Sequence, residues 1–224
     1  MYSAVVFDLD GTLLDTLDDL ADAVNFALSH YGLPVRTREE VCTFIGNGMQ
    51  NLMMRASGIW DEREVEGLLA TFKKHYAAHC KDKTKPYDGI IPLLRNLKAH
   101  GIKTAVLSNK ADFATKQLAE EYFDGLLDEA VGEDEAHGIR KKPCPDALFA
   151  IMQRFGVDGQ ETLYVGDSDV DIRTGENANV HCVSVTWGFR DRAFLLANGA
   201  KTFVSSPQEI LDICLKGVYR VCAE

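Results

Sequence analysis

The sequence lacks the features of a membrane-bound or secreted chain. No apolar run approaches the roughly 20 residues that a helix needs to cross a bilayer. The first residues contain neither the basic nor the apolar segment of a secretory signal. The six cysteines show no CxxC spacing, so neither a zinc site nor a disulfide framework is expected. We therefore expect a cytoplasmic protein with free thiols and no membrane partner.

Basic residues are also in short supply. The 24 lysines and arginines are outnumbered by 34 aspartates and glutamates, which leaves a formal charge of −10. Binding to nucleic acid needs a basic surface, so this balance excludes a nucleic-acid partner. An anionic substrate would need a metal ion or well-placed lysines to concentrate positive charge at its site. With 224 residues, the chain has room for one large domain, or for one domain with a smaller insert.

Two carboxylates follow an apolar run near the N-terminus. The run Ala4-Val5-Val6-Phe7 predicts a buried strand, and Asp8, Asp10 and Gly11 come directly after it. Gly11 lets the backbone turn away behind the two carboxylates. Such a pair can consist of ordinary turn or capping residues. At the end of a buried strand, however, it indicates a functional site.

The next stretch is helical. Apolar residues at helical spacing predict helices over 16–31, 39–45, 49–57 and 62–80, with no strand between Thr16 and Asp82. We expect residues 16–82 to form a helical domain inserted into the domain that the first strand begins.

Beyond a turn at 86–89, strands and helices alternate. Strands are predicted at 103–107, 127–131, 162–165, 181–185 and 202–204, with helices at 91–100, 113–122, 146–155, 169–178, 192–197 and 207–215. This alternation indicates an α/β fold with a doubly wound parallel sheet and right-handed crossovers. The core domain is therefore predicted to comprise residues 1–15 and 83–224.

Polar side chains follow several of the predicted strands. Besides Asp8 and Asp10, they are Ser108-Asn109 after the strand at 103–107, Lys142 in a loop, and the segment 166–171, which reads GDSDVD. The carboxyl ends of parallel strands meet at one edge of a sheet, where open α/β sheets bind ligands. We expect these groups to converge in one crevice.

Each group also has an ordinary structural explanation. Ser108 and Asn109 are good helix N-caps, and Asp167 or Asp169 could cap the helix that begins beside them. Lys142 could be a solvated loop lysine. The joint placement of these residues at successive strand ends favours a shared site.

A carboxylate cluster of this kind suits Mg²⁺, which prefers oxygen ligands and also binds phosphate. Together with a lysine and a hydroxyl, the ion can neutralise a phosphoryl group during its transfer. One carboxylate can attack phosphorus to form an aspartyl-phosphate, and a second can protonate the leaving oxygen and then activate water. Asp8 and Asp10 fit these two roles.

The segment 7–13, which reads FDLDGTL, resembles the first motif of the haloacid dehalogenase superfamily of phosphohydrolases. Ser108, Lys142 and the GDSDVD segment are similar to its second, third and fourth motifs in order and spacing. The helical insert lies where that superfamily has its C1 cap. The similarity is greatest to the phosphoglycolate phosphatase branch, and it covers essentially the whole chain.

The resemblance implies a role for each matching residue. Asp8 would be the nucleophile, and Asp10 the general acid and base, an acid that dehalogenases of the superfamily lack. Lys142 would bridge phosphate and nucleophile, and Asp171 would hold this lysine or a metal-bound water. The implied metal ligands are Asp8, Asp10 through its carbonyl oxygen, Asp167 and Asp171. The implied phosphate ligands are Thr12, Ser108, Asn109 through its backbone, and Lys142.

Two further features concern the resemblance. The loop Gly46-Asn47-Gly48 resembles the cap loop that faces the active site in that branch. Its backbone N–H groups could bind a substrate anion, or it could be a simple turn between helices. At Asn179 the family usually has glycine. Because Asn is the next-best residue for a left-handed helix C-cap, we expect the fold to be unaffected.

The predicted function is Mg²⁺-dependent hydrolysis of a small phosphorylated metabolite, with phosphoglycolate as the first candidate. Pyrophosphate, sugar phosphates, nucleoside monophosphates and a mutase reaction are the alternatives. A phospho-accepting receiver domain would lack the helical insert and would have its acceptor Asp on a middle strand. A scaffold without activity would be expected to have lost one of Asp8, Asp10, Lys142 and Asp167, and all four are present.

Overall fold

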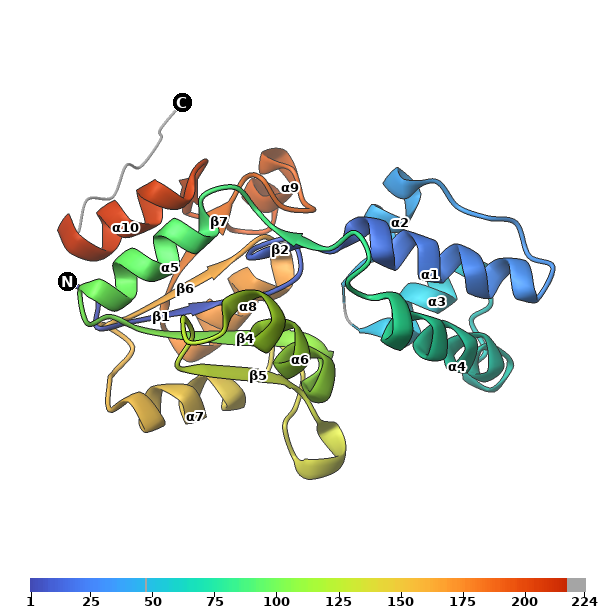
Figure 1. Cartoon of the computed structure of the whole chain (residues 1–224), viewed down its shortest axis with the longest axis horizontal. Coiled ribbons are helices and arrows are strands. Elements are labelled where there is room, and N and C mark those ends of the chain that lie inside the picture. The colour runs from blue at the N-terminus through green and yellow to red at the C-terminus, as the bar shows by residue number, and fades with distance from the viewer. Residues whose placement is uncertain (47, 217–224) are drawn as a thin grey trace. The chain divides into compact units, whose positions relative to one another are not determined.

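The computed structural model of the chain describes residues 1–46 and 48–216. It divides into two compact units, which Figure 1 shows in a single view. One unit consists of Met1–Leu14 and Pro86–Glu224, and the other is Asp15–Lys85. The short strands β2 (Leu14–Asp15) and β3 (Lys85–Pro86) pair with each other at the two places where the chain passes between the units.

A six-stranded parallel sheet with the order β5-β4-β1-β6-β7-β8 forms the centre of the first unit. The chain starts in the middle at β1, adds β4 and β5 on one side, and then crosses to β6, β7 and β8 on the other. This confirms the predicted doubly wound α/β fold. The strands are β1 (Ala4–Phe7), β4 (Lys103–Ala111), β5 (Glu129–Glu133), β6 (Thr162–Gly166), β7 (His181–Val185) and β8 (Thr202–Val204).

Helices cover both faces of this sheet (Figure 1). On one face α7 packs on β1 and β4, and its residues Leu148 and Ile151 share a core with Val6 and Tyr164. Elsewhere α5 packs against α10 and β4. The helices of this unit are α5 (Ile90–Ala99), α6 (Asp112–Phe123), α7 (Asp146–Phe155), α8 (Asp169–Ala178), α9 (Arg192–Ala197) and α10 (Pro207–Lys216), with a 3-10 turn at Glu135–His137.

Strand β4 is longer than predicted. It continues through Ser108 and Asn109 to Ala111, and α6 begins at once at Asp112. The expectation that Ser108 and Asn109 follow the strand was therefore wrong, and so was their alternative reading as helix caps. The extension includes a shift in register against β5, which itself lies at Glu129–Glu133 rather than at 127–131. Such irregularities depend on tertiary packing and leave little trace in a local pattern.

Both ends of α8 are defined by capping residues. At the N-terminus the Ser168 side chain accepts a hydrogen bond from the Asp171 amide, and the two residues form a capping box. Neither Asp167 nor Asp169 is the cap, which corrects that alternative. At the C-terminus Asn179 has φ 53° and ψ 43°, so the predicted left-handed cap is confirmed.

The second unit is helical, and none of its described residues between Thr16 and Asp82 lies in a strand. Its helices are α1 (Leu17–His30), α2 (Arg38–Phe44), α3 (Met49–Ser57) and α4 (Glu62–His79). A capping box of Thr37 and Glu40 begins α2, and Asp61 caps α4. The apolar faces of the four helices meet in a core that includes Val24, Val41, Met53 and Phe72, all fully buried.

Candidate active site

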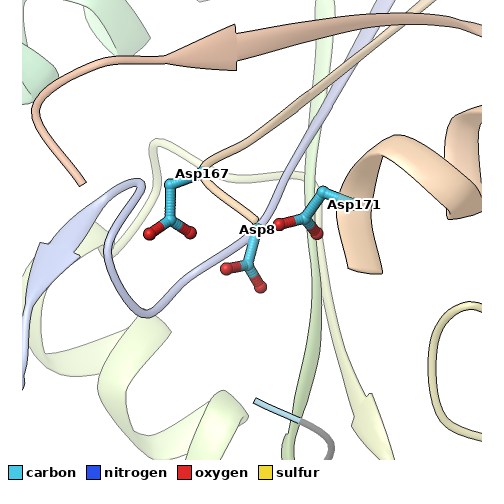
Figure 2. A group of neighbouring side chains, drawn as sticks. All are labelled: Asp8, Asp167 and Asp171. Atoms are coloured by element: carbon cyan, nitrogen blue, oxygen red, sulfur yellow. The ribbon is translucent and has the colours of Figure 1, made fainter. Parts of the chain in front are cut away.

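Three buried carboxylates meet at the carboxyl edge of the sheet (Figure 2). Asp8 follows β1, Asp167 follows β6, and Asp171 lies in the first turn of α8. One oxygen from each lies within 4.8 Å of the others. The structure therefore brings together one residue near the N-terminus and two from the last third of the chain. β1 and β6 are neighbours on either side of the point where the strand order reverses, which is where such sheets bind ligands.

Lys142 links two of these carboxylates. Its Nζ atom lies 2.6 Å from Oδ1 of Asp8 and 2.8 Å from Oδ1 of Asp171, and the lysine is only 4% exposed. Burial alone would lower the pKa of Lys142, but Asp171 and Asp8 outweigh burial and raise it. The Tyr164 hydroxyl donates a further hydrogen bond of 2.9 Å to Oδ1 of Asp171. Lys142 is thus a charged group within the cluster, and the solvated-loop alternative is wrong.

The carboxylates themselves lie in an unfavourable environment for negative charge. Burial raises the pKa of Asp8 to about 7, with Lys142 opposing the rise and Asp171 adding to it. Burial, followed by the charges of Asp8 and Asp171, also raises the pKa of Asp167 well above its usual value. A divalent cation would remove this repulsion. The donor set, carboxylate oxygens without His or Cys, suits a hard cation.

Asn109 contacts Lys142 rather than lying free for a ligand. Its side-chain Oδ1 accepts a hydrogen bond from the Lys142 amide at 2.6 Å, and its Nδ2 donates one to the Lys142 carbonyl at 3.0 Å. The side chain therefore fixes the lysine's backbone. Ser108 is buried nearby, and its Oγ accepts from the Lys110 amide at 3.2 Å. Thr12, also buried, donates to Oδ1 of Asp167 at 3.4 Å.

The Asp10 carboxylate lies outside the group of three and has a different lysine beside it. The distance from its Oδ2 to Nζ of Lys110 is 3.3 Å. The Asp10 side chain is 16% exposed and that of Lys110 only 2%. Lys110 was not among the residues singled out from the sequence, because a lysine shortly after the predicted strand at 103–107 carries no distinctive local signal.

A loop after β7 also contributes to the site and was missed from the sequence. The backbone amide of Phe189 donates to Oδ2 of Asp167 at 2.7 Å, and the Trp187 indole donates to the Thr12 carbonyl at 3.1 Å. Between them, Gly188 has no room for a side chain. A Cβ there would lie 2.3 Å from Cβ of Asp167 and 2.5 Å from the carbonyl oxygen of Gly11. A Trp-Gly-Phe sequence after a strand was the available signal.

The predicted cap residues belong to the helical unit. Gly46 has φ 116°, and its carbonyl accepts a hydrogen bond from Arg55, which also binds the Phe44 carbonyl. Asn47 lies outside the described residues. Contact of this loop with a substrate stays a prediction.

The five described cysteines are free thiols, as expected for that part of the chain. None of the described helices has the length and apolar character required to cross a bilayer.

Comparison with known proteins gives one consistent picture. The family model described as haloacid dehalogenase-like hydrolase matches residues 5–185. A phosphoglycolate phosphatase of Pseudomonas putida is 35% identical, over 98% of this chain and 79% of its own length. One from Chromobacterium violaceum is 35% identical, over 96% of this chain and 97% of its own. A crystal structure from Lactobacillus delbrueckii subsp. bulgaricus, provisionally assigned as a phosphoglycolate phosphatase, has a TM-score of 0.91 and 35% identity. It covers 96% of this chain and 99% of its own.

Proposed function

The chain belongs to the haloacid dehalogenase-like hydrolase family, and from that premise we propose that it is a phosphatase that hydrolyses a small phosphomonoester, with phosphoglycolate as the leading substrate. Relatives named phosphoglycolate phosphatase, similar over nearly the whole chain, support this choice of substrate. The observation that carries the proposal is the contact between Asp8 and Lys142. A buried carboxylate beside a buried ammonium can act as a nucleophile toward an anion, because the ammonium offsets the repulsion.

The reaction has two steps. An Asp8 oxygen forms a bond to phosphorus while the bond from phosphorus to the alcohol oxygen breaks, and Asp10 gives that oxygen its proton. Water then attacks the phosphorus of the aspartyl-phosphate and passes a proton to Asp10 while the bond from phosphorus to the Asp8 oxygen breaks. This releases inorganic phosphate and restores the Asp8 carboxylate and the protonated Asp10. The separate surroundings of Asp8, inside the buried cluster, and of Asp10, more exposed and outside it, support this division of roles.

Other residues of the site are proposed to hold the phosphoryl group and a cation. Lys142 would contact the phosphate as well as Asp8, and Ser108, Thr12 and the Asn109 backbone would donate to its oxygens. Asp8, Asp167 and Asp171, with the Asp10 carbonyl, would hold Mg²⁺. When bound, the cation supplies positive charge that stabilises the transferring phosphoryl group. The all-carboxylate donor set supports Mg²⁺ over metals that favour His or Cys.

The helical unit Asp15–Lys85 is proposed to select the substrate as a cap, with Gly46 and Asn47 as candidate contacts. Pyrophosphate, a sugar phosphate and a mutase reaction remain alternatives at the level of substrate. A receiver-type signalling role is disfavoured by the family match, which includes the helical insert. The free thiols of the described cysteines support a reducing cytoplasmic location.

The decisive experiment measures hydrolysis of phosphoglycolate and of a panel of phosphorylated metabolites with and without Mg²⁺, ranked by kcat/KM. We expect Mg²⁺-dependent turnover, with phosphoglycolate ranked first. Acid quenching during turnover should trap phosphate on the protein, and Asp8→Asn should remove both the trapped phosphate and the turnover, a loss of roughly 10⁴-fold or more. Undiminished turnover by Asp8→Asn would refute the proposal.

A further inference from the structure

Lys110 is a buried lysine that the reaction described above does not use. Its side chain is 2% exposed, and its Nζ lies 3.3 Å from Oδ2 of Asp10. A lysine is almost never buried to this extent without a partner, because removing an ammonium from water is costly. The pairing with Asp10 is therefore a specific feature of the fold.

The backbone around Lys110 is held in place on several sides. Its amide donates to Ser108 Oγ at 3.2 Å, and its carbonyl accepts from Thr115 Oγ1 at 3.2 Å. Across from it on β5, Gly132 permits a close approach: a Cβ there would lie 2.6 Å from the Lys110 carbonyl oxygen and 2.4 Å from Cα of Asp112. These contacts carry β4 past Ser108 and direct the lysine toward the edge of the sheet where Asp10 lies.

The two buried lysines of the site thus serve different carboxylates. Lys142 contacts Asp8 and Asp171, whereas Lys110 contacts Asp10. The Asp8–Lys142 pair is assigned to attack on phosphorus. The Asp10–Lys110 pair contains the residue that is assigned to proton transfer. A carboxyl group on a single-bonded side chain can rotate, and a fixed cation at one oxygen restricts that rotation.

We propose that Lys110 is a positioning residue for proton transfer: it binds Oδ2 of Asp10 and holds the carboxyl group in the orientation in which it serves the leaving oxygen. This inference rests on the proposed function. It assigns Lys110 no contact with the phosphoryl group, and this distinguishes it from Lys142.

The test uses two leaving groups of different basicity. An alkyl phosphate such as phosphoglycolate releases an alkoxide that needs a proton, whereas p-nitrophenyl phosphate releases a phenolate that is stable without one. The quantity to compare is kcat/KM, because it reports the steps up to release of the leaving group and not the later hydrolysis of the aspartyl-phosphate. General acid catalysis supplies roughly 10²–10⁴-fold, so a displaced acid has a measurable effect.

For Lys110→Met we expect kcat/KM with the alkyl phosphate to fall at least about tenfold further than with p-nitrophenyl phosphate, a part of that general-acid contribution. Lys110→Gln keeps the position polar if the Met variant folds poorly. Its amide is uncharged and one bond shorter than the lysine side chain, so it should show a smaller imbalance in the same direction. Lys103→Met is the matched control, since Lys103 pairs with Asp128 at the opposite, exposed end of β4. It should leave both values unchanged.

Equal losses on the two substrates would overturn the inference and indicate that Lys110 contacts the phosphoryl group or only supports the fold. Inhibition by inorganic phosphate separates these two cases, because substitution of Lys110 would weaken this inhibition only if the lysine is a direct phosphate ligand. Failure of the wild-type enzyme to hydrolyse either substrate would instead refute the proposed function.

Discussion

The side-chain amide of Asn109 binds both backbone polar groups of Lys142, accepting from its N–H at 2.6 Å and donating to its carbonyl at 3.0 Å. This reciprocal pair fixes the residue whose Nζ contacts Asp8 and Asp171. Residues that orient the principal groups of a site typically affect activity by about 10–100-fold. The contribution of Asn109 should therefore be catalytic as well as structural.

We expect Asn109→Ala to lower kcat by about 10–100-fold. It should also lower the free energy of unfolding by about 1–3 kcal/mol, because the Lys142 amide loses its partner. Steady-state kinetics and urea unfolding measure the two effects. Asn177→Ala is the matched control. Asn177 donates to the carbonyl of Pro143, the residue that follows Lys142, but this hydrogen bond lies at the exposed surface. Equal kinetic effects of the two variants would contradict the prediction.

Gly188 provides a second test, at the Asp167 carboxylate of the cluster. An added Cβ would lie 2.3 Å from Cβ of Asp167, so Gly188→Ala must displace the loop whose Phe189 amide binds Asp167. We expect a loss of about 1–3 kcal/mol of stability from overpacking and a weaker response to Mg²⁺ in thermal unfolding. Phe189→Ala keeps the backbone amide and should retain the Mg²⁺ response. A normal Mg²⁺ response of Gly188→Ala would refute this account.

The main features of the fold and part of the site could be predicted because they depend on local patterns and on one topological rule. Asp8, Asp167 and Asp171 follow or adjoin buried strands, and parallel strands bring their carboxyl ends to one edge. The left-handed cap at Asn179 likewise follows from the helix end and the residue type. Both inferences need only local patterns and the order of elements along the chain.

Lys110 and Tyr164 could not be predicted in this way. The direction of the Lys110 side chain depends on a register shift between β4 and β5, and no spacing in the sequence shows that shift. Tyr164 reads as one more apolar strand residue, and only the packing of α8 on β6 brings Asp171 to its hydroxyl. Contacts of this type depend on the positions of two elements at once.

His181 links stability to pH away from the active site. Its ring contacts the Tyr2 hydroxyl at 2.7 Å and Thr202 Oγ1 at 2.9 Å, and burial lowers its pKa below the usual 6.5. Below pH 6.5 the unfolded chain therefore takes up a proton that the folded protein resists. This histidine's contribution to stability is complete above pH 6.5 and is lost as the pH falls through its folded pKa.

The Tm of the wild type should therefore fall more steeply between pH 7 and pH 5 than the Tm of His181→Gln, which lacks the titrating ring. His137→Gln is the control, because His137 is exposed and forms its ion pair with Asp134, which lies three residues away in the sequence. That variant should keep the wild-type slope. Identical slopes for the wild type and His181→Gln would show that burial of this ring does not contribute to acid sensitivity.

When no metal is bound, the carboxylate cluster should change stability with pH in the opposite direction to His181, so that its contribution falls as the pH rises. Burial raises the pKa of Asp8 from 3.8 to about 7, and the pKa of Asp167 is raised as well. Between pH 3.8 and about 7, the folded protein therefore retains a proton on Asp8 that the unfolded chain releases. The Asp8 contribution to stability is therefore complete below pH 3.8 and is lost as the pH rises toward 7.

Mg²⁺ should reverse this loss, because a divalent cation binds the ionised carboxylates and releases their protons. At about 100 times its dissociation constant, a ligand of the folded state adds about 2.7 kcal/mol. We expect the increase in Tm with Mg²⁺ to be larger at pH 8 than at pH 5, and to disappear in Asp167→Asn. Asp169→Asn is the matched control, since Asp169 lies in the same segment but pairs with Arg173. An increase in Tm that is independent of pH, or that survives in Asp167→Asn, would place the cation elsewhere.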